Sequence, residues 1–189
     1  MRSLTWNGLR RSYERLLEAF VVILMVLLTA LVIAGAFFRY IGEALSWYDE
    51  LASIGLVWLT YYGSALAALR GAHIGVPGLV NALPPKVRVA TTIFAEAVVL
   101  AFFIALAITG WQVLMVLQGE HLISLPEVPT QITQSAIPIG AVLFIIAELL
   151  RLPDVLRAAA GSGFGDIEVE EVLAHQHDEA DVAPAGGAR

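Results

Sequence analysis

The chain contains an uncharged run, residues 51–69, with charged side chains at both of its ends. Asp49 and Glu50 precede the run, and Arg70 and His73 follow it. An α-helix needs about 20 consecutive apolar residues to cross the hydrocarbon core of a bilayer. The run therefore predicts a transmembrane helix whose polar ends lie at the two membrane surfaces.

The composition of the whole chain is that of a membrane protein. Of its 189 residues, 58% are hydrophobic and only 15% are charged, and the mean hydropathy is +0.77. The absence of cysteine excludes disulfides, thiolate metal ligands and cysteine nucleophiles. The net charge of −6 belongs to the C-terminal residues 161–189, which hold one arginine and seven acids: Asp166, Glu168, Glu170, Glu171, Asp178, Glu179 and Asp181.

Three more apolar segments accompany the first one along the chain. We expect an all-α membrane protein with a four-helix domain over residues 16–152, its spans lying at about residues 16–38, 47–69, 89–117 and 132–150. Pro138 lacks a backbone donor and is followed by Gly140, so the fourth span should be kinked.

The segments on either side of the four spans differ from them in composition. Residues 1–15 mix Leu and Tyr with Arg side chains, which predicts an amphipathic basic N-terminal helix at the membrane interface. Residues 153–189 are rich in Gly, Ala and acids, which predicts a mostly disordered tail. The pair His175 and His177 in this tail is more typical of solvated side chains than of a metal site.

The distribution of Lys and Arg predicts the orientation in the membrane. The N-terminal segment, the loop between the second and third spans and the C-terminal segment together carry ten of these residues. The loop after the first span has only Arg39, and the loop over residues 118–131 has none. The positive-inside rule therefore places both termini in the cytoplasm.

The start of the second span has a structural and a functional interpretation. Ser46 and Asp49 match a capping box, and Trp47 is a residue typical of the membrane interface. Asp49 and Glu50 would also suit the positive end of the helix dipole. The alternative is that this acidic pair contacts another protein or a cation.

Small residues recur every four positions in the second span. Gly63, Ala67 and Gly71 form a stripe that would let another helix approach closely. The spacing leaves open whether that helix belongs to this chain or to a second protein. At the end of the span, Arg70 is expected to reach the lipid headgroups and His73 to lie at the interface.

Three carboxylates lie within or at the ends of the spans, at a depth where arginines also occur. We favour ion pairs between helices over a functional site as their explanation. Among the acids, Glu96 is the deepest in its span and the one for which a functional role is hardest to dismiss. The residues concerned are Glu18, Glu96 and Glu148 with Arg15, Arg88 and Arg151.

Catalytic and cofactor motifs are missing from the sequence. It contains no nucleophile elbow, zinc-protease motif or phosphate-binding loop, and no basic aromatic surface for nucleic acid. Paired histidines for haem are also absent from the spans. We therefore expect no enzyme activity, no catalytic residues, no cofactor, no metal and no nucleic-acid partner.

Several short stretches carry a resemblance to a known family: Trp47-Tyr-Asp-Glu-Leu, Val57-Trp58-Leu, Gly63, Arg70-Gly-Ala-His-Ile-Gly-Val76 and Ala136-Ile-Pro-Ile-Gly140. Together they resemble the small (Q) membrane subunit of tripartite ATP-independent periplasmic (TRAP) transporters, over about residues 10–155. The polar residues Glu127, Thr130 and Gln131 and the acidic tail depart from that pattern.

The resemblance implies a subunit of the bacterial inner membrane that packs on a large (M) membrane subunit and extends its scaffold. In this family the M subunit carries an organic anion, typically a carboxylate, together with sodium, and a periplasmic (P) binding protein delivers the anion. The resemblance and the small-residue pattern give packing or interface roles to Trp47, Asp49, Glu50, Trp58, Gly63, Ala67, Arg70, Gly71, His73, Pro138 and Gly140. The alternative is a self-sufficient four-helix carrier or channel, acting as a homodimer with Glu96 as its coupling site.

Overall fold

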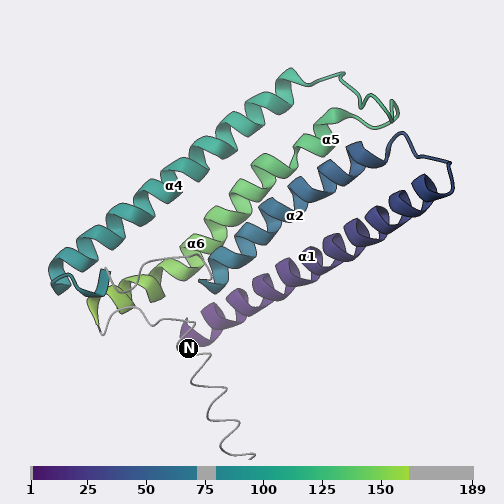
Figure 1. Ribbon diagram of the computed structural model, residues 1–189. Coiled ribbons are helices and arrows are strands. Elements are labelled where there is room, and N and C mark those ends of the chain that lie inside the picture. Colours follow the sequence, from purple (N-terminus) through teal and green to yellow (C-terminus); the bar gives the residue numbers. More distant parts are fainter. Residues whose placement is uncertain (1, 72–79, 162–189) are drawn as a thin grey trace, which may run out of the picture. The chain divides into compact units, whose positions relative to one another are not determined.

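The structure is a computed structural model that describes residues 2–71 and 80–161. In these two ranges the chain is helical apart from turns and loops. The helices, labelled in Figure 1, are α1 (Arg2–Tyr40), α2 (Tyr48–Arg70), α4 (Pro85–Val116), α5 (Thr130–Gln134) and α6 (Ala136–Ala160). His73 and the acidic residues 162–189 lie outside the described residues, so the predictions made for them stay predictions.

Four helical stretches of the described residues are long and apolar enough to cross a membrane. They are Gly8–Tyr40, Tyr48–Arg70, Pro85–Val116 and Thr130–Ala160. The prediction of an all-α membrane protein with four spans is therefore confirmed. The orientation of the termini stays a prediction, because no membrane accompanies the chain.

The N-terminal segment does not form a separate interfacial helix. Instead α1 runs without a break from Arg2 to Tyr40, a length of about 58 Å at 1.5 Å per residue. The hydrocarbon core of a bilayer is only about 30 Å thick, so α1 must extend beyond it. No proline interrupts these residues, and that is why the amphipathic segment continues the span.

The start of the fourth span is interrupted one turn earlier than its proline suggested. The short helix α5 ends at Gln134, and α6 begins at Ala136. Pro138 is the third residue of α6, where the missing backbone N–H costs little because first-turn donors have no partner within the helix. The interruption therefore lies at Ser135 rather than at Pro138.

The end of the fourth span also differs from the prediction. We expected the helix to end near residue 150 and the tail to begin at Pro153. Instead α6 continues through Pro153 to Ala160. A proline inside a helix removes one backbone hydrogen bond, which membrane helices tolerate when neighbouring groups compensate.

The described chain divides into two compact units. The first unit contains α1, α2, α5, the part of α4 from Ala95 onward and α6 as far as Pro153. The second unit contains the beginning of α4, up to Phe94, and the end of α6 from Asp154.

The core of the first unit lies where α1, α2 and α6 meet (Figure 1). Its small members let the helix backbones approach closely, which is the usual way that helices associate in lipid. Gly140 is part of this approach, since a Cβ atom there would lie only 2.6 Å from Cβ of Tyr61. The buried members of the core are Leu17, Tyr62, Ala65, Ala68, Leu69, Phe144, Ala147 and Leu150.

Helix α4 packs on α6 within the same unit. The rings of Phe103 and Phe144 are stacked with their centroids 3.6 Å apart. Closer to α5, a Cβ atom at Gly110 would lie 3.1 Å from Cδ of Pro138. Pro138 and Gly140 therefore both serve contacts within this chain.

In the second unit, Arg88 caps the end of α6. It is only 6% exposed, and its Nε donates to the carbonyl of Ala159 at 2.7 Å. A second guanidinium nitrogen donates to the carbonyl of Gly161 at 2.5 Å. A cation suits the carbonyl end of a helix, so these contacts satisfy groups that no helical donor reaches.

Candidate functional site around the second span

The capping box expected at the start of α2 is not formed. Trp47 is the N-cap residue, its backbone is helical, and no side chain caps the helix. Asp49 instead lies 3.7 Å from Arg39 at the end of α1, and both side chains are largely exposed. A carboxylate in the first turn still suits the helix dipole, so Asp49 keeps that part of its predicted role.

Glu50 holds the loop between α4 and α5 (residues 117–129). One carboxylate oxygen accepts the backbone N–H of Ser124 at 3.0 Å and also accepts the hydroxyl proton of the same residue. Two donors on one charged acceptor make a strong contact. Glu50 therefore joins the beginning of α2 to a loop more than seventy residues away in the sequence.

Trp58 joins α2 to both neighbouring elements of the first unit. Its Nε1 donates to the carbonyl of Thr133 in α5 at 3.1 Å. Its ring stacks on Tyr62, with the centroids 5.5 Å apart, and Tyr62 in turn contacts Phe20 of α1. Trp58 is therefore a packing residue of the chain itself.

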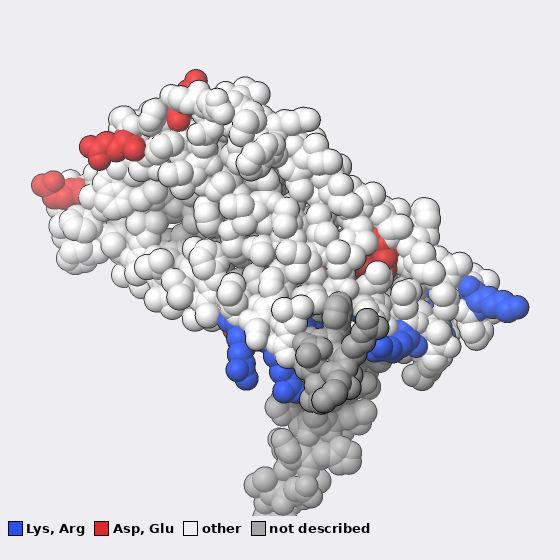
Figure 2. Space-filling view, turned by 180° about the vertical axis from the view of Figure 1, so that it is seen from behind, with Lys and Arg blue, Asp and Glu red and all other residues white. Residues whose placement is uncertain are grey.

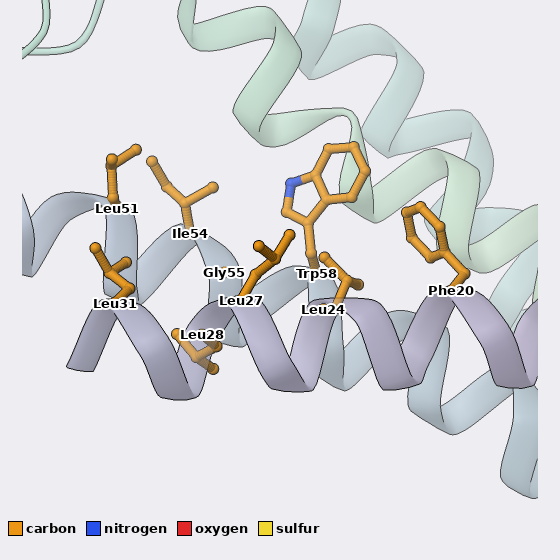
Figure 3. A pocket seen from close by; sticks show the side chains of 9 residues that line it. All are labelled: Phe20, Leu24, Leu27, Leu28, Leu31, Leu51, Ile54, Gly55 and Trp58. Carbon is orange, nitrogen blue, oxygen red and sulfur yellow. The ribbon is translucent and has the colours of Figure 1, made fainter. Parts of the chain in front are cut away.

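An open groove of about 360 Å³ lies between α1 and α2 beside Trp58 (Figure 3). The side chains that line it are hydrocarbon apart from the indole nitrogen of Trp58, which already has an acceptor. Burying a carboxylate there would leave it without a partner, at a high cost in free energy. The groove is therefore no site for an organic anion. It is lined by Phe20, Leu24, Leu27, Leu28, Leu31, Leu51, Ile54, Gly55 and Trp58.

Most side chains on the face of α2 opposite the core are small or weakly polar. We call this face the outward face. Within residues 2–71 and 80–161, nothing lies within 4 Å of the position that a Cβ atom at Gly63 would take. Ser53 and Thr60 donate their hydroxyl protons to carbonyls of their own helix, and Ala67 is half-buried. The face also includes Leu56, so it consists of Ser53, Leu56, Thr60, Gly63 and Ala67, spaced three or four residues apart.

The predicted stripe of small residues is thereby divided between two environments. Gly63 and Ala67 lie on the outward face, whereas Gly71 ends α2 in the left-handed conformation with φ of 71°. A Cβ atom at Gly71 would lie 3.2 Å from Nε of Arg151, and the positive φ favours glycine there. Gly71 therefore serves the chain's own fold.

The other end of α2 is tied to α1 by charged groups. Arg70 contacts Glu14 at 2.9 Å and Glu18 at 3.0 Å. Arg10 donates to the carbonyl of Leu69 at 3.2 Å, which satisfies a group in the last turn of α2. We expected Arg70 to reach the lipid headgroups, but it binds two carboxylates of α1. Glu18 therefore pairs with Arg70 and not with the exposed Arg15.

The buried acid of α6 is paired within its own helix. Glu148 is 4% exposed and lies 3.4 Å from Arg151, one turn farther on. Its second oxygen is buried and makes no hydrogen bond in the described part of the chain. We expected Glu148 to form an ion pair with another helix, whereas this ion pair lies within α6.

Glu96 and Arg88 complete the predicted set of intramembrane charges. Glu96 is half-buried and lies two turns before Phe103, just as Arg151 lies two turns after the facing Phe144. Antiparallel packing thus places Glu96 level with Arg151. Arg88 binds the carbonyls at the end of α6, so its expected carboxylate partner is replaced by backbone oxygens.

Two of the residues that make contacts between elements could not be recognised from the sequence. Ser124 is an ordinary loop residue, and Tyr13, which donates to the carbonyl of Leu143 at 2.7 Å, looked like part of an interfacial helix. Glu14 could have been found, because it precedes Glu18 by one helical turn on the same face. Among the described residues, no group of three or more His, Asp or Glu side chains is arranged to hold a metal ion.

Comparison with known proteins points to one family. The sequence pattern described as "Tripartite ATP-independent periplasmic transporters, DctQ component" matches residues 28–158. That range contains α2, α4 and α5 and nearly all of α6.

Two proteins of Vibrio cholerae serotype O1 are similar to this chain. The C4-dicarboxylate TRAP transporter small permease protein DctQ is 34% identical over 101 residues, which are 53% of this chain and 42% of that protein. The sialic acid TRAP transporter small permease protein SiaQ is 23% identical over 154 residues, which are 81% of this chain and 88% of that protein. The chain thus matches less than half of the first relative and most of the second.

Proposed function

Because the chain belongs to the DctQ component family of the TRAP transporters, we propose that it is the small membrane subunit of such a transporter. It is a multi-pass protein of the inner membrane. In our proposal it packs on a large membrane subunit and extends that subunit's scaffold. The large subunit carries a small organic anion inward together with sodium, and a periplasmic binding protein delivers the anion.

The observation that best supports this proposal is the outward face of α2. Helix surfaces that meet lipid normally carry large apolar side chains, as the exposed Val26, Ile33, Phe94 and Phe102 of α1 and α4 do. The outward face instead has open space beside Gly63, and its hydroxyl groups are satisfied within the helix. Such a surface suits close approach by another helix. In our proposal that helix belongs to the large subunit.

The charged and apolar sites of the chain support a role without direct transport chemistry. The groove between α1 and α2 is apolar, and the contacts of Glu50, Arg70 and Arg88 fasten one element of this chain to another. Groups already committed to such contacts are poorly suited to bind and release a substrate. We therefore propose that Trp47, Asp49 and Glu50 position α2 and its loop, and that the outward face provides the docking surface.

The test is reconstitution with each component omitted in turn. The chain should co-purify with the large subunit, and uptake of the anion into proteoliposomes should require both membrane subunits, the binding protein and a sodium gradient. Vesicles that hold this chain alone should show no uptake. Sodium-driven uptake by the isolated chain would contradict the proposal. In that case, loss of uptake in the Glu96→Gln variant would favour the homodimeric carrier.

A further inference from the structure

One large apolar side chain on the loop between α4 and α5 is almost fully exposed. Ile123 is 94% exposed, the highest value among the large apolar side chains of the described residues. It lies outside the four stretches able to cross a membrane, so a place in the lipid core does not explain its exposure.

Both neighbours of Ile123 are fixed, so its side chain cannot simply turn inward. Leu122 is 8% exposed, and its N–H donates to the carbonyl of Val128 across the loop at 3.1 Å. On the other side, Ser124 is held through its backbone and its hydroxyl by Glu50. At the base of the loop, the N–H of Thr130 donates to the carbonyl of Glu120 at 3.0 Å. These hydrogen bonds hold the backbone of the loop in place on both sides of Ile123, so its side chain is exposed from a fixed backbone.

Exposed acids lie on this loop and close to the beginning of α2 in the sequence. Glu120 and Glu127 lie on the same loop, and Glu43 and Asp49 lie near the beginning of α2, all with exposed side chains. Figure 2 shows acidic side chains gathered at one end of the face that it displays. In the described chain, Arg39 is the one arginine or lysine near this end, and it already faces Asp49, while His121 lies on the loop itself.

This charge pattern argues against lipid as the partner of Ile123. Segments that insert an apolar residue at the headgroup level normally carry Lys, Arg, Trp or Tyr beside it, since phospholipid surfaces are neutral or anionic. The loop has no Lys or Arg, and it carries two carboxylates within four residues of Ile123. A protein that brings cationic side chains to the same place would be attracted.

We propose that Ile123 is an anchor for a water-soluble protein that offers an apolar recess rimmed by Lys or Arg. The inference rests on the proposed function, in which the loop faces outward and that protein is the binding protein that delivers the anion. A single apolar anchor in a pocket carries much of the binding energy of many interfaces. An anchor whose backbone is already held in place loses little conformational entropy on binding.

The chain's lack of cysteine allows a direct spectroscopic test. A nitroxide label is attached to the Ile123→Cys variant in the reconstituted membrane complex. Before the binding protein is added, the label should be accessible to a water-soluble relaxant. Addition of the purified binding protein should reduce both this accessibility and the mobility of the label. A label at Tyr40→Cys, an 89% exposed position at the end of α1, should change much less and serves as the control.

Three results would overturn the proposal. Preferential access of the label to membrane-dissolved oxygen would place Ile123 in lipid. A label that is inaccessible before the binding protein is added would place it against the large subunit. An accessible label that does not respond to the binding protein would show that no docking occurs there.

Transport gives a second measurement. Ile123→Ser should raise the binding-protein concentration that gives half-maximal uptake about tenfold, as expected for loss of an apolar anchor, and leave the maximal rate unchanged. Ile123→Val keeps most of the apolar surface and should change the half-maximal concentration little. Glu50→Gln should have part of the effect of Ile123→Ser, because it weakens the contact that holds Ser124 beside Ile123. An unchanged half-maximal concentration for Ile123→Ser would refute the anchor.

The proposed function and the role of Ile123 as an anchor can be disproved independently. If the wild-type chain does not co-purify with the large subunit, the proposed function is wrong whatever Ile123 does. If it co-purifies and supports uptake while Ile123→Ser behaves like wild type, only the anchor is wrong.

Discussion

The two faces of α2 have opposite characters. The inner face packs Trp58, Tyr62, Ala65 and Leu69 against α1 and α6, and the last three are nearly inaccessible. Apart from the exposed Leu56, the outward face has small and hydroxyl side chains, and in the described chain nothing lies within 4 Å of a Cβ atom at Gly63. Of the four spans, α2 also has the lowest mean hydropathy. The aromatic residues thus lie on the side that this chain covers itself, and most residues on the side that it leaves open are small or carry a hydroxyl group.

Helix α2 therefore has a surface that its own chain does not cover. Helices α1 and α4 expose large apolar side chains, which lipid solvates well, and few of their residues are buried. The outward face of α2 offers lipid little apolar area, but it offers another helix a close approach. Changes on the inner face should therefore damage folding, and changes on the outward face should damage assembly.

The largest effect is expected from Gly140→Leu, on the inner side of the comparison. A side chain there would collide with Tyr61, whose Cβ atom is fixed to the backbone of α2, so α2 and α6 would have to separate. Overpacking of this kind costs about 3 kcal/mol in severe cases. Unfolding of the purified chain by detergent titration measures the loss. A stability equal to that of wild type would show that the two helices are not in close contact.

Arg151→Met should have the next largest effect. It leaves Glu148, which is 4% exposed, without its cation, and stranding a buried charge is strongly destabilising. Because Arg151 itself is partly exposed, we expect a loss of about 2 kcal/mol in unfolding free energy, below the range for fully buried pairs. The double variant with Glu148→Leu should recover most of it. Additive losses in the double variant would mean that the two residues do not act as a pair.

Gly63→Leu tests the role of the outward face. The chain alone should unfold as wild type does, because the added side chain meets open space. Co-purification with the large subunit should fall about tenfold, since the close helix approach is blocked. The matched control is Val98→Leu on the exposed surface of α4, which should assemble normally. Normal assembly of Gly63→Leu would show that the outward face meets lipid.

Arg70→Gln should have the smallest effect. Its two contacts with Glu14 and Glu18 join α2 to α1, but its side chain is 43% exposed and solvent screens the charges. Exposed ion pairs contribute about 1 kcal/mol or less. The loss in unfolding free energy should shrink further at high salt. A large loss that salt does not change would mean that the arginine acts through packing instead.

The four spans could be predicted because length and apolar character are local properties of the sequence. The bounds were less predictable, because a helix continues wherever nothing stops it. Residues 2–15 join α1 since no proline precedes Tyr40, and α6 passes through Pro153 because one lost hydrogen bond does not end a packed helix. Both differences are consequences of cooperativity along a helix rather than of any single residue.

The pairings of the candidate site could be predicted only in part. Glu50, Arg70 and Gly140 were identified as contact residues, but their partners Ser124, Glu14 and Tyr61 were not. A sequence pattern tells which side chains share one face of a helix, whereas a contact between helices depends on their relative register. Register is set by the packing of the whole core.

The amino-acid sequence is sufficient to identify a four-span helical membrane protein, because a long apolar segment is stable in a bilayer only as a helix that satisfies its own backbone groups. Its motifs also determined the family. Which small residues are covered within the chain and which stay open became known from the packing of the helices. Gly140 and Gly71 are covered by Tyr61 and Arg151, whereas no described atom lies within 4 Å of a Cβ atom at Gly63. The reason is geometric: residues of one type have the same local preferences, and only the arrangement of the surrounding helices distinguishes them.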